Sequence, residues 1–143
     1  MGSIFIKLNF QENFNAEFNP ETGVSTVTFN NKLGKFTGSA HLNPADTASQ
    51  FIGCHIAEAR ANIAYYKTAL RYAKERVKVL CAACKVEPST ILQGMLKNAE
   101  KNVETLKNRV KSETAYLENY ISSLDKERAA REVILGSFFA GQN

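Results

Sequence analysis

The sequence has few cysteines and no long apolar stretch, and both features narrow the class of protein. Its three cysteines, Cys54, Cys81 and Cys84, are an odd number, and the start Met-Gly-Ser-Ile lacks the charge and the apolar run of a signal peptide. We therefore expect a protein of a reducing compartment, the cytoplasm. The apolar stretches fall far short of the roughly 20 residues that a membrane span requires, so we expect no membrane segment.

Motifs of the common enzyme classes are also absent. The sequence contains no Gly-x-Ser-x-Gly, no His-Glu-x-x-His, no phosphate-binding loop and no dinucleotide-binding glycine cluster. Hydrolytic, phosphoryl-transfer and redox enzymes therefore lack a signature here. We expect a protein that is not an enzyme, with no catalytic residue and no cofactor.

The pair Cys81-Ala-Ala-Cys84 has the spacing of a zinc or redox site. A tetrahedral metal would need two more ligands, and only Cys54, His41 and His55 exist, none of them at a paired spacing. Cys84 also falls on an apolar helix stripe, where small thiols are ordinary core residues. We therefore predict core packing and no metal site.

The positive charge of the chain is concentrated in one stretch. The 143 residues have a composition typical of a globular domain, and the net charge is +4. Residues 60–85 carry seven Lys and Arg against the single Glu75, which gives a local charge of +6. An anionic partner would be drawn to this stretch.

Alternation of apolar and polar residues predicts an antiparallel β-sheet over residues 1–42. The alternation runs through Ile4, Ile6, Leu8 and Phe10 and returns in residues 14–18. A turn at 19–23, a β-branched run at 24–29, a turn at 30–34 and a last strand near 35–42 follow. Three or four strands result.

A long helix is predicted over residues 43–86. Asn43 can cap its start, Pro44 suits the first helical position, and Asp46 complements the positive helix end. Apolar residues then repeat at spacings of four and three over more than four heptads. This first stripe consists of Ile52, Ile56, Ala59, Ile63, Tyr66, Leu70, Ala73, Val77, Leu80 and Cys84.

A second long helix is predicted over residues 89–135, because Pro88 interrupts the first. Gly136 is expected to end it and to leave a tail of residues 136–143. Phe138 and Phe139 of this tail either take part in assembly or fold back on the sheet. The second stripe consists of Leu92, Leu96, Ala99, Val103, Leu106, Val110, Glu113, Leu117, Tyr120 and Leu124.

These elements predict an α+β fold in a single domain of residues 1–143, a small N-terminal antiparallel β-sheet followed by a long antiparallel helical hairpin. The two apolar stripes pair either within one chain or between chains. Ala57, Ala61 and Ala64 form a further stripe of small residues that would let another helix approach closely. We therefore expect a homo-oligomer.

The basic stretch is the candidate ligand-binding site. Its tyrosines are interleaved with cations, which offers ring faces for bases and fixed charges for phosphates. Arg71 follows Lys67 by four residues, so these two cations share a helix face. The alternative is a solvated basic face with Tyr66 in the apolar stripe. The predicted ligand-binding residues are Tyr65, Arg71, Tyr72, Arg76 and, from the paired helix, Arg109.

Two neighbouring stretches carry a resemblance to a known family. They read Phe36-Thr-Gly38-Ser-Ala40-His41-Leu-Asn43-Pro44-Ala-Asp46 and Gly53-Cys-His-Ile56-Ala57-Glu-Ala59-Arg60-Ala61. A β-hairpin ending in Gly-x-Ala, a Pro-x-Asp helix cap and an Ile-Ala-x-x-Arg-Ala-like stretch occur in this order in phage Thoeris anti-defence signal sponges. The chain resembles that family over about residues 24–67.

The resemblance implies a phage-encoded, non-enzymatic protein that acts as an oligomer in the cytoplasm of the bacterial host cell. Such sponges sequester the cyclic ADP-ribose-type signal of an immune pathway, and some members sequester other cyclic nucleotides, so that the effector receives no signal. The family holds its ligand with an aromatic ring on the adenine and arginines on the phosphates, in pockets between subunits.

Two function classes remain open. The first is capture of a small cyclic nucleotide signal. The second is a protein-binding inhibitor or scaffold that presents its helical hairpin to a host nuclease or nucleic-acid machine, which the long apolar stripes favour. Direct binding of nucleic acid by the basic face is a third idea, which the sequence favours least.

Overall fold

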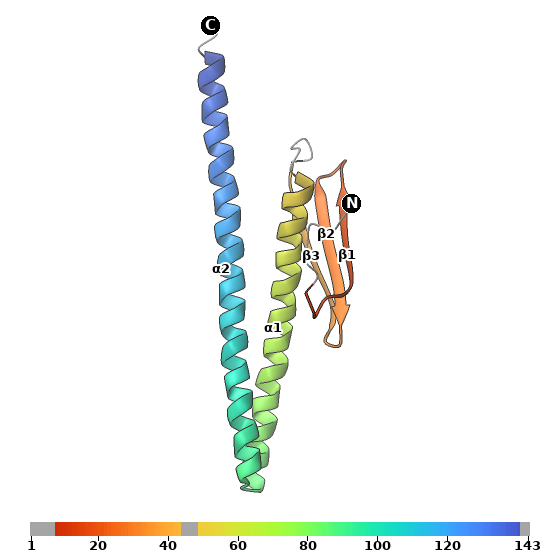
Figure 1. Cartoon of the computed structure of the whole chain (residues 1–143), viewed down its shortest axis with the longest axis vertical. Helices are drawn as coiled ribbons and strands as arrows, with labels where there is room; N and C mark the ends of the chain where they lie inside the picture. The colour runs from red at the N-terminus through yellow and green to blue at the C-terminus, as the bar shows by residue number, and fades with distance from the viewer. Residues whose placement is uncertain (1–7, 44–48, 141–143) are drawn as a thin grey trace.

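A three-stranded antiparallel sheet packs against the first helix of a long helical hairpin in the computed structural model of this protein (Figure 1). The structure describes residues 8–43 and 49–140, and the side chains of 8–43 and 50–127. The elements are β1 (Glu12–Asn19), β2 (Val24–Asn31), β3 (Gly34–His41), α1 (Ser49–Val86) and α2 (Thr90–Ala140). The predicted α+β class is confirmed.

The sheet is a meander in the order β1-β2-β3, and its inner face packs on α1. Alternate residues of β2 are buried, as a half-covered strand requires, and Val27 and Phe29 are fully buried. Phe29 pairs with Phe36 and Val27 pairs with Gly38 across β2 and β3. The part of the predicted alternation at Ile4 and Ile6 lies outside the described residues.

The helix α1 approaches β3 very closely at Gly38. A Cβ atom at Gly38 would overlap the carbonyl oxygen of Ala57 and would lie 2.6 Å from the backbone nitrogen of Ala61. Both alanines are fully buried. The alanine stripe therefore meets the chain's own sheet, and our reading of it as a site for another helix was wrong. The homo-oligomer stays a prediction without this support.

The two apolar stripes pair with each other within one chain, and every residue of both is buried or half-buried. This settles the choice between pairing within and between chains. The short connection after Val86 places α2 antiparallel beside α1 (Figure 1). The core at the sheet end combines sheet residues with Ile56, Ile63 and Leu117.

The outer end of α2 differs from the predicted bound. The backbone of α2 remains helical through Ala140, so the predicted end at Gly136 is wrong. A glycine costs a helix only about 1 kcal/mol relative to alanine, and no proline follows to stop it. Phe138 and Phe139 continue α2 rather than return to the sheet. The described part of α1 begins at Ser49. Pro44 and Asp46, which follow the predicted cap Asn43, lie outside the described residues.

The sheet lies beside only one end of α1 (Figure 1). We call residues 49–66 of α1 the covered half and residues 67–86 the bare half. Tyr65, near the border, is the last α1 residue whose ring contacts the sheet, with Phe36 at 5.5 Å between ring centroids. Tyr66 still contacts Phe10, at 5.6 Å between ring centroids, and the apolar stripe beyond it packs on α2.

Candidate functional site

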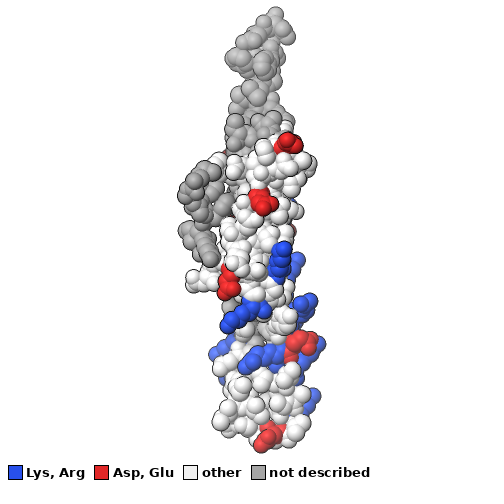
Figure 2. Space-filling view, turned by 90° about the vertical axis from the view of Figure 1, so that its right-hand side faces the viewer, with Lys and Arg blue, Asp and Glu red and all other residues white. Residues whose placement is uncertain are grey.

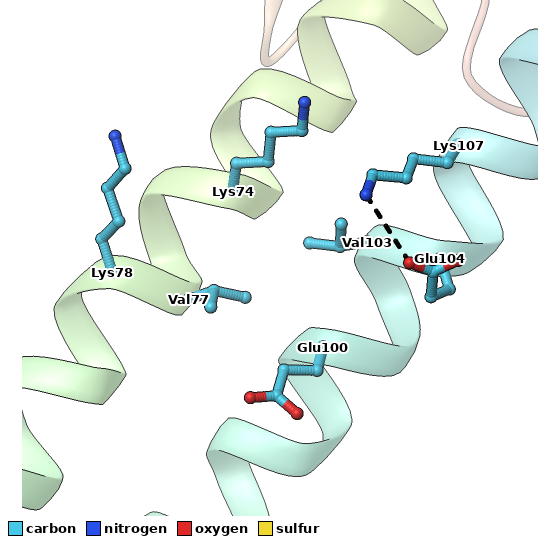
Figure 3. A pocket seen from close by; sticks show the side chains of 7 residues that line it. All are labelled: Lys74, Val77, Lys78, Glu100, Val103, Glu104 and Lys107. Atoms are coloured by element: carbon cyan, nitrogen blue, oxygen red, sulfur yellow. Dashed lines mark ion pairs between the residues drawn. The ribbon is translucent and has the colours of Figure 1, made fainter.

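Two hollows flank the line along which α1 and α2 pack below the sheet. We call the first the lysine hollow; it has a volume of about 560 Å³ and is lined by Lys74, Val77, Lys78, Glu100, Val103, Glu104 and Lys107 (Figure 3). We call the second the arginine hollow; it has a volume of about 540 Å³ and is lined by Tyr66, Thr105, Leu106, Asn108, Arg109 and Ser112. Helix periodicity places the two on opposite sides of the apolar stripes.

A ridge of exposed cations on α1 borders the lysine hollow. Lys67, Arg71, Lys74 and Lys78 follow one another at spacings of four, three and four, which places all four on one side of the helix. Lys and Arg side chains gather over this part of the molecule, beyond the sheet (Figure 2). We call these four residues the cationic ridge. The ridge shows that four of the seven Lys and Arg residues of the basic stretch lie together on one side of α1.

The floor of the lysine hollow is apolar. Val77 of α1 and Val103 of α2 belong to the packed stripes and point toward each other across the gap between the helices (Figure 3). Lys107 reaches over the gap from α2, where its Nζ lies 3.6 Å from Oε1 of Glu104. The hollow therefore combines an apolar base with ammonium groups at its rim.

The electrostatics of the lysine hollow favour an anion. Three lysines line it against two glutamates, and Lys67 and Arg71 of the ridge add two more cations beside it. Among the described residues Lys74 has no ion-pair partner, whereas Lys78 Nζ lies 3.2 Å from Oε1 of Glu75. Exposed pairs of this kind contribute little to stability, so a phosphate can displace them at small cost. Phosphate groups are good partners for such lysines.

The predicted site residue Tyr65 lies in the core between sheet and helix. Its ring stacks on Phe10 with 4.3 Å between centroids and 6° between planes, and the edges of Phe29, Phe36 and Tyr66 surround it. The face that would hold a base is occupied by Phe10. We therefore correct the role of Tyr65 from ligand stacking to core packing.

The other predicted residues of α1 do not form one cluster. Arg71 belongs to the cationic ridge, and its guanidinium lies 5.4 Å from the ring centroid of Tyr72. Tyr72 and Arg76 are exposed, lie four residues apart on a different side of α1, and line neither hollow. The structure thus brings Arg71 beside the lysine hollow and leaves Tyr72 and Arg76 outside it.

Arg109, the predicted residue of α2, lines the arginine hollow and is already engaged. Its guanidinium lies 5.1 Å from the ring centroid of Tyr66, and its Nε lies 3.0 Å from Oε1 of Glu113. Burial raises the pKa of the Tyr66 phenol, and the charge of Arg109 partly offsets this rise. A ligand in this hollow would have to displace Glu113 and compete for Arg109, so we favour the lysine hollow.

Sequence reasoning missed Lys74, Lys78 and Lys107 as site residues. The first two carried a usable signal, because their spacing from Lys67 and Arg71 continues a single helix face. The contribution of Lys107 depends on which turn of α2 lies opposite Val77, and local sequence does not contain that information. The valine floor had been assigned correctly to the apolar stripes but not to a site.

The cysteines are free thiols. Cys54 is buried, and Cys81 and Cys84 are half-buried. Among the residues that the structure describes, no three His, Cys, Asp or Glu side chains gather in a way that could hold a metal ion. The described helices also include none with the length and apolar content needed to cross a membrane.

Comparison with protein-family models, with curated proteins and with solved structures found no match. The features of this chain that bear on function are the two hollows and the charge of the bare half. The lysine hollow is the stronger site because its charge, its apolar floor and the neighbouring ridge all favour the same kind of ligand. Its volume is within the range of small-molecule sites.

Proposed function

We propose that this is a phage-encoded, non-enzymatic protein that sequesters a cyclic nucleotide or cyclic ADP-ribose-type immune signal and so blocks bacterial anti-phage defence. The observation that carries the proposal is the lysine hollow, an apolar floor under a rim of cations beside the cationic ridge. A nucleotide has the matching chemistry, an apolar ring face joined to phosphates. The resemblance over residues 24–67 is in keeping with the same class.

The ligand lies with its phosphates against Lys74, Lys78 and Lys107 and with its base on Val77 and Val103. A hydrogen bond to a charged group contributes about 1.5–3 kcal/mol, so three lysine contacts and the buried ring surface supply the attraction that must exceed the cost of association. Capture of this kind needs no bond to form or break. It lowers the concentration of free signal and leaves the signal intact.

Assembly fits the same site. The lysine hollow is open on the side away from its valine floor, and a second subunit laid over it would enclose the ligand. This is the arrangement that the resemblance implies. Arg71, which lies beside the hollow on the ridge, would then contact the outer phosphate.

Calorimetry with cyclic ADP-ribose isomers and with cyclic di- and trinucleotides tests the proposal. We expect heat of binding with at least one of them. Replacing Lys74 with Glu removes one phosphate contact and adds a repulsive charge, so we expect affinity to fall at least about tenfold. The matched control is Lys101→Glu, the same charge change at an exposed position of α2 that does not line the hollow.

Two results would overturn the proposal. One is the absence of heat with every nucleotide of the panel at millimolar concentration. The other is an equal loss of affinity in Lys74→Glu and Lys101→Glu, which would show a response to total charge rather than to a site. Circular dichroism of both variants verifies that the helices are retained.

A further inference from the structure

A second surface of α1 has the pattern of a helix interface but no partner. The stripe that begins with Ala57, Ala61 and Ala64 under the sheet continues along the same side of α1 at spacings of four and three. In the bare half it consists of Thr68, Tyr72, Glu75, Val79, Ala82 and Val86, which we call the bare face. The sheet ends before it (Figure 1).

The largest side chains of the bare face are exposed. Tyr72, Val79 and Val86 lie seven residues apart, and their exposed fractions are 50%, 66% and 86%. Single exposed apolar residues are common, but three in heptad register on one helix side match the spacing of a coiled-coil contact. They do not belong to the stripe that packs on α2. A helix of a partner would cover them.

The charges along the bare face indicate which kind of partner helix would bind there. Arg71, Lys78 and Lys85 follow one edge at the same spacing of seven, and Arg76 lies on the other edge. Glu75 is the one acidic residue among them and is paired with Lys78. In coiled coils the charges beside the apolar stripe select a partner of opposite sign.

We propose that the bare face binds an acidic amphipathic helix of another protein, with aliphatic residues on Tyr72, Val79 and Val86 and carboxylates on the flanking cations. This goes beyond ligand capture: the apolar contact lies on a different side of α1 from the floor of the lysine hollow, and Arg71 and Lys78 border both surfaces. A second copy of this chain fits poorly, because the same face would present cations to cations. The phosphates of a nucleic acid could pair with the flanking cations, but a nucleic acid offers no aliphatic stripe to pack on Val79 and Val86.

The test uses the full chain and two labelled synthetic helices of about three heptads each. Both carry Leu at the apolar positions; one carries Glu at the flanking positions and the other carries Lys. We expect fluorescence anisotropy to show saturable binding of the Glu peptide only. Binding should weaken as salt is raised, because the flanking pairs are exposed.

Two variants locate the contact. Val79→Ser removes the central aliphatic side chain and should weaken binding of the Glu peptide about tenfold. Ile91→Ser makes the same kind of change at another exposed aliphatic residue, on α2, and should leave binding unchanged. Lys107→Glu should impair nucleotide binding and not peptide binding, so failure of this inference can be told from failure of the proposed function.

Several outcomes would overturn the inference. These are equal binding of the Glu and Lys peptides, and equal binding by the wild-type chain and Val79→Ser. A third is sedimentation that shows a wild-type dimer lost in Val79→Ser, which would make a second copy the occupant. A fourth is tight binding of single-stranded DNA by the wild-type chain that Val79→Ser leaves unchanged while the Glu peptide fails to bind, which would assign the face to nucleic acid.

Discussion

The same side of α1 carries different residues in the covered half and in the bare half. Under the sheet the stripe is made of alanines, Gly38 brings β3 to backbone contact with it, and the charges of the half are one Arg and one Glu. In the bare half the stripe holds Tyr72, Val79 and Val86, and six Lys and Arg stand against one Glu. Close packing against the sheet leaves little room for charged side chains in the covered half. The bare half has no such packing, so its surface is available for binding.

The largest expected effect is a difference in the free energy of unfolding between a substitution in the core of the sheet and one in the bare half. Phe29 is fully buried at the centre of the sheet, so Phe29→Ala should lower the free energy of unfolding by about 3–5 kcal/mol. Tyr72→Ala removes another aromatic ring from the bare half and should change it by no more than about 0.5 kcal/mol. Urea denaturation of both variants measures the difference. Equal losses would show that the bare half is also part of the cooperative core.

A smaller effect tests the close approach of β3 and α1. Gly38→Ala places a methyl group against the backbone of Ala57 and Ala61 and should cost about 1–3 kcal/mol or more. Gly94→Ala, in α2, meets nothing within 4 Å and should stabilise the helix by about 1 kcal/mol. Thermal unfolding followed by circular dichroism compares the two. A neutral Gly38→Ala would mean that the sheet does not press on α1.

The smallest effect concerns a polar contact within the covered half. Glu58 is 9% exposed and accepts a hydrogen bond of 3.3 Å from Nε2 of Gln11, which also donates to Oδ1 of Asn62 at 2.8 Å. Burial raises the pKa of the Glu58 carboxyl, and the bond from Gln11 partly opposes this. The folded chain therefore holds this proton more tightly than the unfolded chain does.

It follows that the stabilising contribution of Glu58 is present at low pH and is lost as pH rises from about 4.5 through its folded pKa. Glu58→Gln keeps a neutral hydrogen-bonding side chain, so we expect it to raise the unfolding temperature at pH 7 and to change it less at pH 4. Glu17→Gln, at an exposed position of β1, should show no such pH dependence. A loss of stability in Glu58→Gln at pH 7 would contradict this reading.

The repeating elements were predictable because local sequence determines them. Both apolar stripes were predicted residue by residue, since a helix in contact along its length must repeat with its turn. The strands after residue 12 were predicted from alternation in 14–18, from the β-branched run at 24–29 and from the turns that separate them. The helix end at Gly136 was not predictable from one glycine, because continuing a helix through it costs little compared with the rest of α2.

The partners of each stripe were not predictable, because they depend on contacts between residues far apart in the sequence. The alanine stripe was assigned to another helix, and it meets Gly38 instead. Tyr65 was assigned to a ligand, and Phe10, 55 residues earlier, occupies its ring face. The location of the charge was predicted correctly. The hollow that uses it depends on the register of α2, which brings Val103 opposite Val77.

The central claim is that the bare half binds ligand while the covered half only supports the fold. A titration of the ¹⁵N-labelled chain with cyclic ADP-ribose, or with the tightest nucleotide of the panel, tests it most directly by mapping amide shifts. We expect shifts concentrated in residues 67–78 and 100–107, with the strands unchanged. Shifts confined to the sheet at 12–41, or no shifts at a saturating concentration of every nucleotide tried, would contradict it.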